Sequence, residues 1–375
     1  MSAREICSRC VLDRTVEDIE FDADGVCNYC RGYEAIIKTV PTGMEAEKVL
    51  AEKVERIKAA RGKHGYDCII GISGGVDSTY LAYLVKKHGL TPLAVHIDTG
   101  WNSEIAVKNI ENVVTKLDID LFTVVVDWAE MRELQLAFFR ASLPDCDIPQ
   151  DHVFPAELFK IAEKFDIKHV ISGHNLVTEY VLPRSWSYDS NDLEHIKDVN
   201  RKCGSRKLAN YPQLSLFKRT IYYKFIRPIQ VHRFLYYVPY DKEQIKIFIE
   251  RELGWKDYGG KHFESRFTKF FQSYYLVEKF GYDKRKAHLS NLIVSGQMSR
   301  DEALAELKNP PYIEADIRND IDFVLSKLNL DRDSWAEIMA RPPRAHSEFR
   351  SEADVRWFKV YKILAKHVKR LVRGA

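Results

Sequence analysis

The segment that most constrains the fold is CIIGISGGVDSTYLAYL, residues 68–84. Residues 68–72 are apolar enough for a buried parallel strand, and residues 79–88 have the periodicity of a helix. Two adjacent glycines allow a tight turn between them, and the N-terminus of the following helix attracts anions. The segment therefore predicts a phosphate-binding loop, with a plain strand–turn–helix corner as the alternative. The loop residues are Ser73, Gly74, Gly75, Val76, Asp77 and Ser78.

Strands and helices alternate after this loop, which is typical of an α/β fold with a parallel sheet. We expect strands near residues 67–72, 92–97, 121–126 and 169–172. We expect helices near residues 45–61, 78–88, 103–117, 129–140 and 155–165. Ligands of such sheets bind beyond the carboxyl ends of the strands, so residues that directly follow strands are the candidate site residues.

The 375 residues suffice for more than one compact unit. We expect a cysteine module at residues 1–40, the α/β domain at 41–240 with a polar, aromatic-rich insertion at 183–225, and a mainly helical region at 241–375. No apolar run reaches the roughly 18 residues of a membrane span. The opening MSAREICSRC lacks a signal sequence, so we expect a cytoplasmic protein without membrane insertion. A net charge of +3 makes a nucleic-acid partner unlikely.

Two CxxC pairs open the chain, Cys7 with Cys10 and Cys27 with Cys30, separated by sixteen residues. Thiolate pairs at this spacing are typical of a structural, tetrahedral zinc site formed by two short knuckles. Disulfides are disfavoured in a reducing compartment. Redox chemistry and an iron–sulfur cluster are the alternatives.

SGGVDS does not fit the GxxxxGK[ST] pattern of nucleoside-triphosphate P-loops. It resembles the PP-loop of the N-type ATP pyrophosphatases, whose fold is the adenine nucleotide alpha hydrolase-like fold. That resemblance implies that ATP adenylates a carbonyl oxygen with release of pyrophosphate. A nitrogen or sulfur nucleophile then displaces AMP.

Further candidates for nucleotide contacts follow predicted strands. Ile97 and Asp98 end one strand at the height expected for a ribose or adenine contact, although a surface Asp at a strand end is common. Gly173 and His174 resemble the second glycine loop of the family, and Glu179 resembles the magnesium-binding carboxylate of its amide-forming members. An ordinary helix start is the alternative there. Arg227 resembles a basic residue near the phosphates, with a solvated arginine as the alternative.

Three segments are candidates for substrate contacts. DCDIPQDH (residues 145–152) packs acids, a thiol and a histidine into one proline-bounded loop, and a catalytic cysteine is a minor alternative there. Trp101 and Asn102 are expected at the same rim, unless they are a helix cap with a packed tryptophan. YGGKHFESRFTKFF (residues 258–271) presents polar groups before an aromatic stripe that we assign to the core. The candidate substrate residues are Trp101, Asn102, Cys146, Asp147, Lys261, His262, Glu264 and Arg266.

The four-cysteine head, SGGVDS, the GHN loop with Glu179, DCDIPQDH and YGGKHFESRFTKFF together resemble the N-acetyl sugar amidotransferases of the WbpG and PseA type. The resemblance extends from residue 6 to about residue 308. It implies that an acetamido group on a UDP-linked or related sugar becomes an acetamidino group. Such sugars serve lipopolysaccharide O-antigen, other surface-polysaccharide or nonulosonic-acid biosynthesis.

An amide oxygen is a poor leaving group, and transfer of AMP to it makes an intermediate from which ammonia displaces AMP. In this reading Asp77, Ser78, His174 and Glu179 are the catalytic residues, and Asp77 and Glu179 are the Mg²⁺ ligands. ATP, Mg²⁺ and structural Zn²⁺ are the implied cofactors. Cys7 belongs to a knuckle, so the resemblance implies a separate glutaminase of the HisH type, with a barrel subunit of the HisF type that delivers ammonia.

Two other readings remain open. A PP-loop tRNA sulfur transferase also places zinc knuckles before its loop, but it predicts catalytic cysteines that Cys146 and Cys203 do not supply. A non-catalytic nucleotide-binding subunit is the other reading, and the intact SGGVDS loop with Glu179 argues against it.

Overall fold

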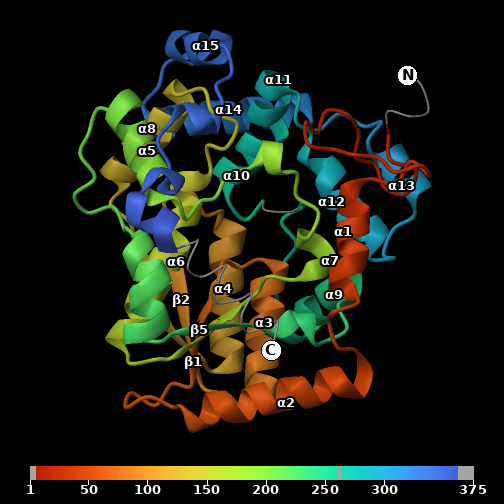
Figure 1. The fold of residues 1–375 in the computed structure, drawn as a ribbon, viewed down its shortest axis with the longest axis vertical. Helices are drawn as coiled ribbons and strands as arrows, with labels where there is room; N and C mark the ends of the chain where they lie inside the picture. The colour runs from red at the N-terminus through yellow and green to blue at the C-terminus, as the bar shows by residue number, and fades with distance from the viewer. Residues whose placement is uncertain (1–5, 261–262, 362–375) are drawn as a thin grey trace.

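The computed structural model describes residues 6–260 and 263–361. In this part of the chain, five strands form one parallel sheet in the order β3-β2-β1-β4-β5 (Figure 1). The strands are β1 (Cys68–Gly71), β2 (Pro92–Asp98), β3 (Asp120–Val125), β4 (His169–Ser172) and β5 (Gln230–Arg233). The sheet grows in opposite directions from β1 and β4, and ligands of open α/β sheets bind at such a switch point.

The predicted α/β class is confirmed, and the four expected strands match β1 to β4. Strand β5 was not predicted. It is an edge strand in which only His232 is buried, so its sequence QVHR has no apolar run to identify it.

Helices cover both faces of the sheet, because neighbouring side chains of a strand point to opposite sides. Ile69 packs into one core cluster, while Cys68 and Ile70 pack into another. The second cluster also includes residues of α2 (Gly43–Ala59), α3 (Val76–Lys87), α4 (Glu104–Leu117) and α9 (Lys242–Leu253). The first includes residues of α5 (Trp128–Arg140), α6 (Ile148–Lys164) and α8 (Leu193–Cys203).

Helix α6 begins at Ile148, seven residues before the expected start near residue 155. The second half of the segment DCDIPQDH is therefore helical rather than loop. Pro149 lies in the first turn, where a missing N–H disrupts no helical hydrogen bond. Proline was a misleading boundary signal here.

The expected insertion contains α8 and a π-helical segment, Lys218–Ile226, that leads into β5. After it, the chain is mainly helical, as expected from residue 241 on. The aromatic stripe is core, since Phe267, Phe270 and Phe271 are buried. The remaining helices of eight residues or more are α1 (Asn28–Ile37), α12 (Lys284–Val294), α14 (Glu314–Leu328) and α15 (Arg332–Ala340). Shorter ones are α7 (Leu176–Glu179), α10 (Arg266–Phe270), α11 (Leu276–Phe280) and α13 (Arg300–Glu306).

The N-terminal cysteine segment packs against the C-terminal helices rather than standing apart. Its four cysteines share a core cluster with Ala287 and Val294 of α12. Figure 1 shows α1 beside α12 on the right of the view, whereas α2 runs across the bottom. Over the described residues, no helix is both long enough and apolar enough to cross a membrane.

Gly74 makes the turn between β1 and α3 possible. Its φ is +79°, and a Cβ atom at this position would lie 2.4 Å from the carbonyl oxygen of Ala106 in α4. Gly65 has a similar φ of +83°, but a Cβ atom there would meet nothing within 4 Å.

We expect Gly74→Ala to lower the free energy of unfolding by about 3 kcal/mol, since it combines left-handed strain with a backbone clash. The matched control Gly65→Ala adds only the strain, and we expect a loss of about 1 kcal/mol. Urea unfolding measures both. Equal losses would show that α4 moves away from the loop at little cost.

Candidate active site

Residues 73–78 form a turn at the carboxyl end of β1, and several hydrogen bonds hold it in place. The indole Nε1 of Trp255 donates to the carbonyl oxygen of Gly74 at 2.8 Å, and the amide of Asn109 donates to the same oxygen at 3.3 Å. The Ser78 hydroxyl donates to the carbonyl oxygen of Gly75 at 3.1 Å and lies 3.3 Å from the Ser73 hydroxyl. These contacts hold the two serine hydroxyls together at the start of α3.

Helix α3 begins with Gly75 as its N-cap, which has no side chain to cap the first turn. The backbone N–H of Val76, in that turn, donates to the hydroxyl of Tyr258. The first N–H groups of a helix have no partner inside it, and the helix dipole adds partial positive charge. Together with the two serine hydroxyls, this helix end has the chemistry of a phosphate site.

A cavity of about 260 Å³, here called the loop cavity, opens on this turn. Lys242 and Lys246 of α9 face it from the other side, and Lys246 Nζ lies 3.0 Å from Asp257. Neither lysine was among the predicted site residues, because lysines on an amphipathic helix are usually solvated. Their spacing of four residues, which places them on one helix face, was the available signal. The loop cavity is lined by Ser73, Gly75, Val76, Asp77, Ser78, Gly173, Thr178, Glu179, Lys242, Lys246, Asp257, Tyr258, Gly259, Gly260 and Glu264.

Asp77 and Glu179 line this same cavity, so the structure brings the two candidate Mg²⁺ ligands together. The hydroxyl of Tyr240 donates to Asp77 Oδ1. Burial and the Asp77 charge raise the pKa of Tyr240, which keeps it a hydrogen-bond donor. Glu179 accepts from the backbone N–H of Asn175 at 3.4 Å. Two carboxylates beside a phosphate-type loop fit a hard cation such as Mg²⁺.

His174 lies beside Glu179. Its Nε2 is 3.9 Å from Glu179 Oε2, and its Nδ1 is 3.0 Å from the hydroxyl of Tyr236. Unlike Gly173 and Glu179, His174 does not line the loop cavity.

A second cavity of about 390 Å³, here called the strand cavity, lies beyond the carboxyl ends of β1 and β2. It shares Ser73 and Glu264 with the loop cavity, so the two adjoin. Ser73, Ile97, Asn102, Asp147 and Glu264 are the predicted residues that line it. The other lining residues are Gly71, Ile72, Val95, His96, Thr99, Gln150, Asp151, Phe154, Leu158, Ser265, Thr268 and Gln272.

Asp98 lines neither cavity. Its hydrogen bonds instead hold the residues that follow β2 in place. Its carboxylate accepts from the N–H of Gly100 at 2.7 Å and from the Asn102 amide at 3.2 Å. Asn102 also lies 3.2 Å from His96 Nε2. The Asp98 contacts therefore hold Asn102 at the wall of the strand cavity.

A third cavity of about 340 Å³, here called the acidic cavity, adjoins both others. It shares Thr178 and Glu179 with the loop cavity, and Asp147, Asp151 and Gln272 with the strand cavity. It is lined by Asp145, Asp147, Asp151, His174, Thr178, Glu179, Val181, Leu182, Ser187, Tyr188, Ser190, Phe271, Gln272, Lys284, His288 and Asn291.

Two predicted substrate contacts are wrong because the residues are core. Trp101 is 1% exposed, packs against Trp128 and Phe267, and donates its indole N–H to Gln135. Cys146 is fully buried, and burial raises the pKa of its thiol well above the ordinary value. Neither lines any of the three cavities.

Two predicted arginine contacts are also wrong. Arg227 lies shortly before β5, and because β5 runs parallel to β4, Arg227 is near the amino ends of the strands, whereas the loop lies at their carboxyl ends. Arg266 is paired with Asp320 at 3.1 Å, lies over the ring of Phe323, and lines none of the three cavities. Lys261 and His262 lie outside the described residues.

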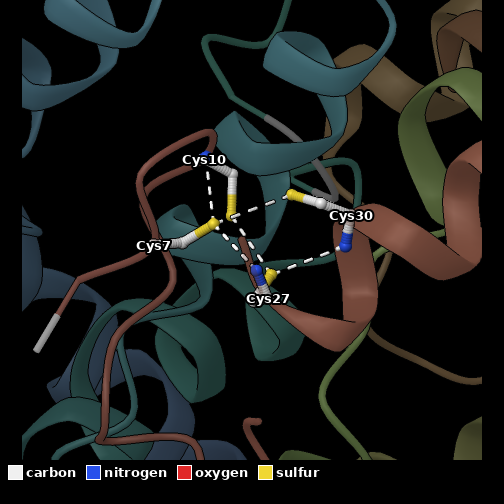
Figure 2. Close-up of side chains that lie close together, drawn as sticks. All are labelled: Cys7, Cys10, Cys27 and Cys30. Atoms are coloured by element: carbon white, nitrogen blue, oxygen red, sulfur yellow. Dashed lines mark hydrogen bonds between the residues drawn. The ribbon is translucent and has the colours of Figure 1, made fainter. Parts of the chain in front are cut away.

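The four N-terminal cysteines converge on one point, as Figure 2 shows. Their sulfur atoms all lie within 4.8 Å of one another, with Cys7 and Cys30 at 3.9 Å and Cys10 and Cys27 at 3.7 Å. A tetrahedral ion with metal–sulfur bonds of about 2.3 Å requires sulfurs about 3.8 Å apart. The cluster therefore fits one metal ion.

Hydrogen bonds support this cluster. The backbone N–H groups of Cys10 and Cys27 donate to the sulfur of Cys7 at 3.4 and 3.2 Å, which favours its thiolate. Hydrogen bonds with the other three cysteines lower the pKa of Cys7. Arg300 of α13 donates to the carbonyl oxygens of Cys7 and Cys10, and so ties the first knuckle to the C-terminal helices. A bound ion would thus stabilise the contact between the cysteine segment and α13.

We expect the purified protein to hold about one equivalent of metal, and Cys10→Ser to lose it, because three thiolates and a hydroxyl bind a soft ion weakly. The midpoint of thermal unfolding should fall together with the metal content. Cys203→Ser, outside the cluster, is the matched control and should change neither. Elemental analysis of both variants makes the measurement, and full metal content in Cys10→Ser would contradict the assignment.

The family model described as "LPS biosynthesis protein WbpG-like, C-terminal domain" matches residues 264–365. The match begins at Glu264, in the wall shared by the loop and strand cavities. It also contains Thr268 and Gln272 of the strand cavity and Lys284 of the acidic cavity. The matched domain therefore forms part of the walls of all three cavities.

Two relatives whose names refer to tRNA thiolation are similar to part of this chain. The cytoplasmic tRNA 2-thiolation protein 1 of Candida albicans is 28% identical over 193 residues, which are 46% of this chain and 47% of that protein. A tRNA-specific 2-thiouridylase of Fusobacterium nucleatum is 31% identical over 121 residues, 30% of this chain and 34% of that protein. The chain thus spans less than half the length of each of these relatives.

Among solved structures, the NH3-dependent NAD synthetase from Campylobacter jejuni aligns with a TM-score of 0.32 at 14% identity. The alignment covers 80% of this chain and 97% of that one.

Proposed function

The chain belongs to the PP-loop ATP pyrophosphatase superfamily and has a WbpG-like C-terminal domain, and on this basis we propose that it is an ATP-dependent sugar amidotransferase. It would convert the acetamido group of a UDP-linked or related N-acetyl sugar into an acetamidino group, for surface-polysaccharide biosynthesis. One observation carries the proposal: the WbpG-like domain lines the strand cavity directly beside the SGGVDS loop.

The loop cavity is suited to bind the β- and γ-phosphates of ATP. The first-turn N–H groups of α3 and the hydroxyls of Ser73 and Ser78 would donate to phosphate oxygens. Lys242 and Lys246 would neutralise their charge from the opposite wall. Asp77 and Glu179 would hold Mg²⁺, which supplies further neutralisation of the leaving pyrophosphate when bound.

The strand cavity is suited to bind the nucleoside of ATP and the sugar substrate. Its lining combines apolar side chains such as Ile97 with polar groups such as Asn102 and Gln150, as a nucleoside and a sugar require. The amide oxygen attacks the α-phosphorus and the bond to pyrophosphate breaks. Ammonia then adds to the amide carbon, and AMP leaves with the former amide oxygen. The protein lowers the barrier by holding the amide oxygen in line with the phosphorus.

The proposed reaction needs a source of ammonia. Cys7, the thiol nearest the N-terminus, lies in the buried four-sulfur cluster and is not a glutaminase nucleophile. We infer that a separate glutaminase of the HisH type, with a barrel subunit of the HisF type, supplies ammonia. Zn²⁺ is the ion we propose for the cysteine cluster.

The alternative is sulfur transfer to tRNA, which the names of the curated relatives suggest. A sulfur transferase is expected to have reactive cysteines near the loop. Cys68 and Cys146 are fully buried, and burial raises the pKa of both thiols, which makes them poor nucleophiles. Cys203 is half-buried and lines none of the three cavities, so the described structure favours the amidotransferase.

We expect pyrophosphate release from ATP and Mg²⁺, with ammonium chloride, to depend on one member of a panel of UDP-linked N-acetyl sugars. Asp77→Asn should reduce this release at least about 100-fold, because it removes a candidate Mg²⁺ ligand beside the phosphates. Asp301→Asn, an exposed residue of α13, is the control and should keep the wild-type rate.

The same assay separates the alternatives. Release only with bulk tRNA would assign the protein to sulfur transfer. Glutamine in place of ammonium should support release only after the glutaminase and barrel proteins are added. Full activity on glutamine by the protein alone would refute the need for a separate glutaminase.

A further inference from the structure

Of the residues that line the acidic cavity, only Glu179 has a part in holding ATP as proposed above, yet the cavity adjoins both of the others. Glu179 joins it to the loop cavity, while Asp147, Asp151 and Gln272 join it to the strand cavity. A small molecule in the acidic cavity would therefore reach the activated amide from a side that neither the pyrophosphate nor the nucleotide occupies.

The charges of this cavity favour a small cation. Four carboxylates line it, those of Asp145, Asp147, Asp151 and Glu179, against the single ammonium group of Lys284. His174 and His288 are the remaining titratable groups of the wall besides Tyr188. A cleft lined mainly by negative charge raises the local concentration of cations.

The contacts of Asp151 set it apart from the other three acids. Asp145 accepts from the backbone N–H of Tyr188 at 3.0 Å, Asp147 from the amide of Gln150, and Glu179 from Asn175. The Asp151 carboxylate makes no hydrogen bond or ion pair within residues 6–260 and 263–361. It is exposed, and it lines both the strand and the acidic cavities.

The position of Asp151 on the first turns of α6 is rigid. Its backbone N–H donates to the carbonyl oxygen of Asp147 at 3.1 Å, and Gln150 beside it accepts from the Thr99 hydroxyl at 2.8 Å. The backbone of Pro149 accepts from the buried Tyr211 hydroxyl at 2.8 Å. A carboxylate held on a rigid helix with an unoccupied acceptor capacity is suited to accept a proton.

We propose that the acidic cavity is the ammonium subsite of the enzyme and that Asp151 is the general base for amidine formation. The inference rests on the proposed amidotransferase function. Ammonium enters the cavity as a cation and gives one proton to Asp151, which frees the lone pair of ammonia. This lone pair forms the bond to the amide carbon while the π electrons of the carbon–nitrogen double bond move to the sugar nitrogen, which takes up a proton from the added nitrogen. The carbon–oxygen bond then breaks, AMP leaves with its electron pair, and the carbon–nitrogen double bond of the amidine forms.

The electrostatic surroundings agree with this role. The exposed surface of Asp151 faces the strand and acidic cavities, but the protein around the carboxylate desolvates it and raises its pKa above the ordinary value. The charges of Asp147 and Asp145 raise the pKa further, while Lys284 lowers it. A base whose pKa lies closer to the working pH transfers protons more effectively than an ordinary carboxylate. The other titratable groups that face Asp151 are Tyr211 behind it, His174, Glu179, His288 and Tyr188 across the acidic cavity, and His96 and Glu264 across the strand cavity.

The test compares two steps in Asp151→Asn and the wild-type protein. The first is sugar-dependent exchange of pyrophosphate with ATP, which reports adenylation. The second is amidine formation from ammonium chloride. We expect amidine formation to fall about 100-fold or more relative to exchange, the usual contribution of a general base.

The pH profile gives a second readout. At a fixed concentration of free ammonia, wild-type amidine formation should fall as the pH drops through the raised pKa of Asp151, since the base acts only when deprotonated. This fall should be absent in Asp151→Asn. Asp151→Glu, which keeps a carboxylate, should retain more amidine formation than Asp151→Asn.

Three outcomes would overturn the assignment: unchanged amidine formation in Asp151→Asn, a parallel loss of exchange and amidine formation, or equal losses in the Asn and Glu variants. Asp301→Asn again serves as the exposed control. Wild-type protein that shows no exchange with any N-acetyl sugar would instead refute the proposed function itself, and the two failures are therefore distinguishable.

Discussion

The close approach of Gly74 to helix α4 is the constraint on which the rest of the site depends. Its backbone lies so near to the carbonyl oxygen of Ala106 that a side chain has no room. The carbonyl of Gly74 is held by Trp255 and Asn109, and the chain can then turn directly into α3. With a looser turn, the N-terminus of α3 would not face Glu179 and the lysines of α9.

The site is assembled from segments far apart in the chain. The loop and the carboxyl ends of β1, β2 and β4 form its base, α9 adds two lysines, and the WbpG-like domain adds a wall from Glu264 onward. The N-terminal cysteine cluster is joined to this same domain through Ala287 and Arg300. A metal at the cysteines would therefore stabilise the C-terminal helices that line the cavities.

Three adjoining cavities suit a reaction of three components. A phosphate-type loop, a mixed polar and apolar cavity and an acidic cavity each favour a different chemical class: polyphosphate, nucleoside or sugar, and small cation. Their shared residues, among them Ser73, Glu179 and Asp151, lie where the components would meet.

The sequence by itself determined the α/β class, four of the five described strands, the phosphate-type loop and the cysteine cluster. These features depend on local patterns: apolar runs, paired glycines and CxxC spacing. Only the tertiary structure decided which polar residues reach the site. Trp101 and Cys146 had plausible neighbours in sequence but are core, and Arg227 lies at the wrong end of its strand. Lys242, Lys246 and Asp151 line the cavities because distant helices pack against the sheet edge, and no local pattern encodes that packing.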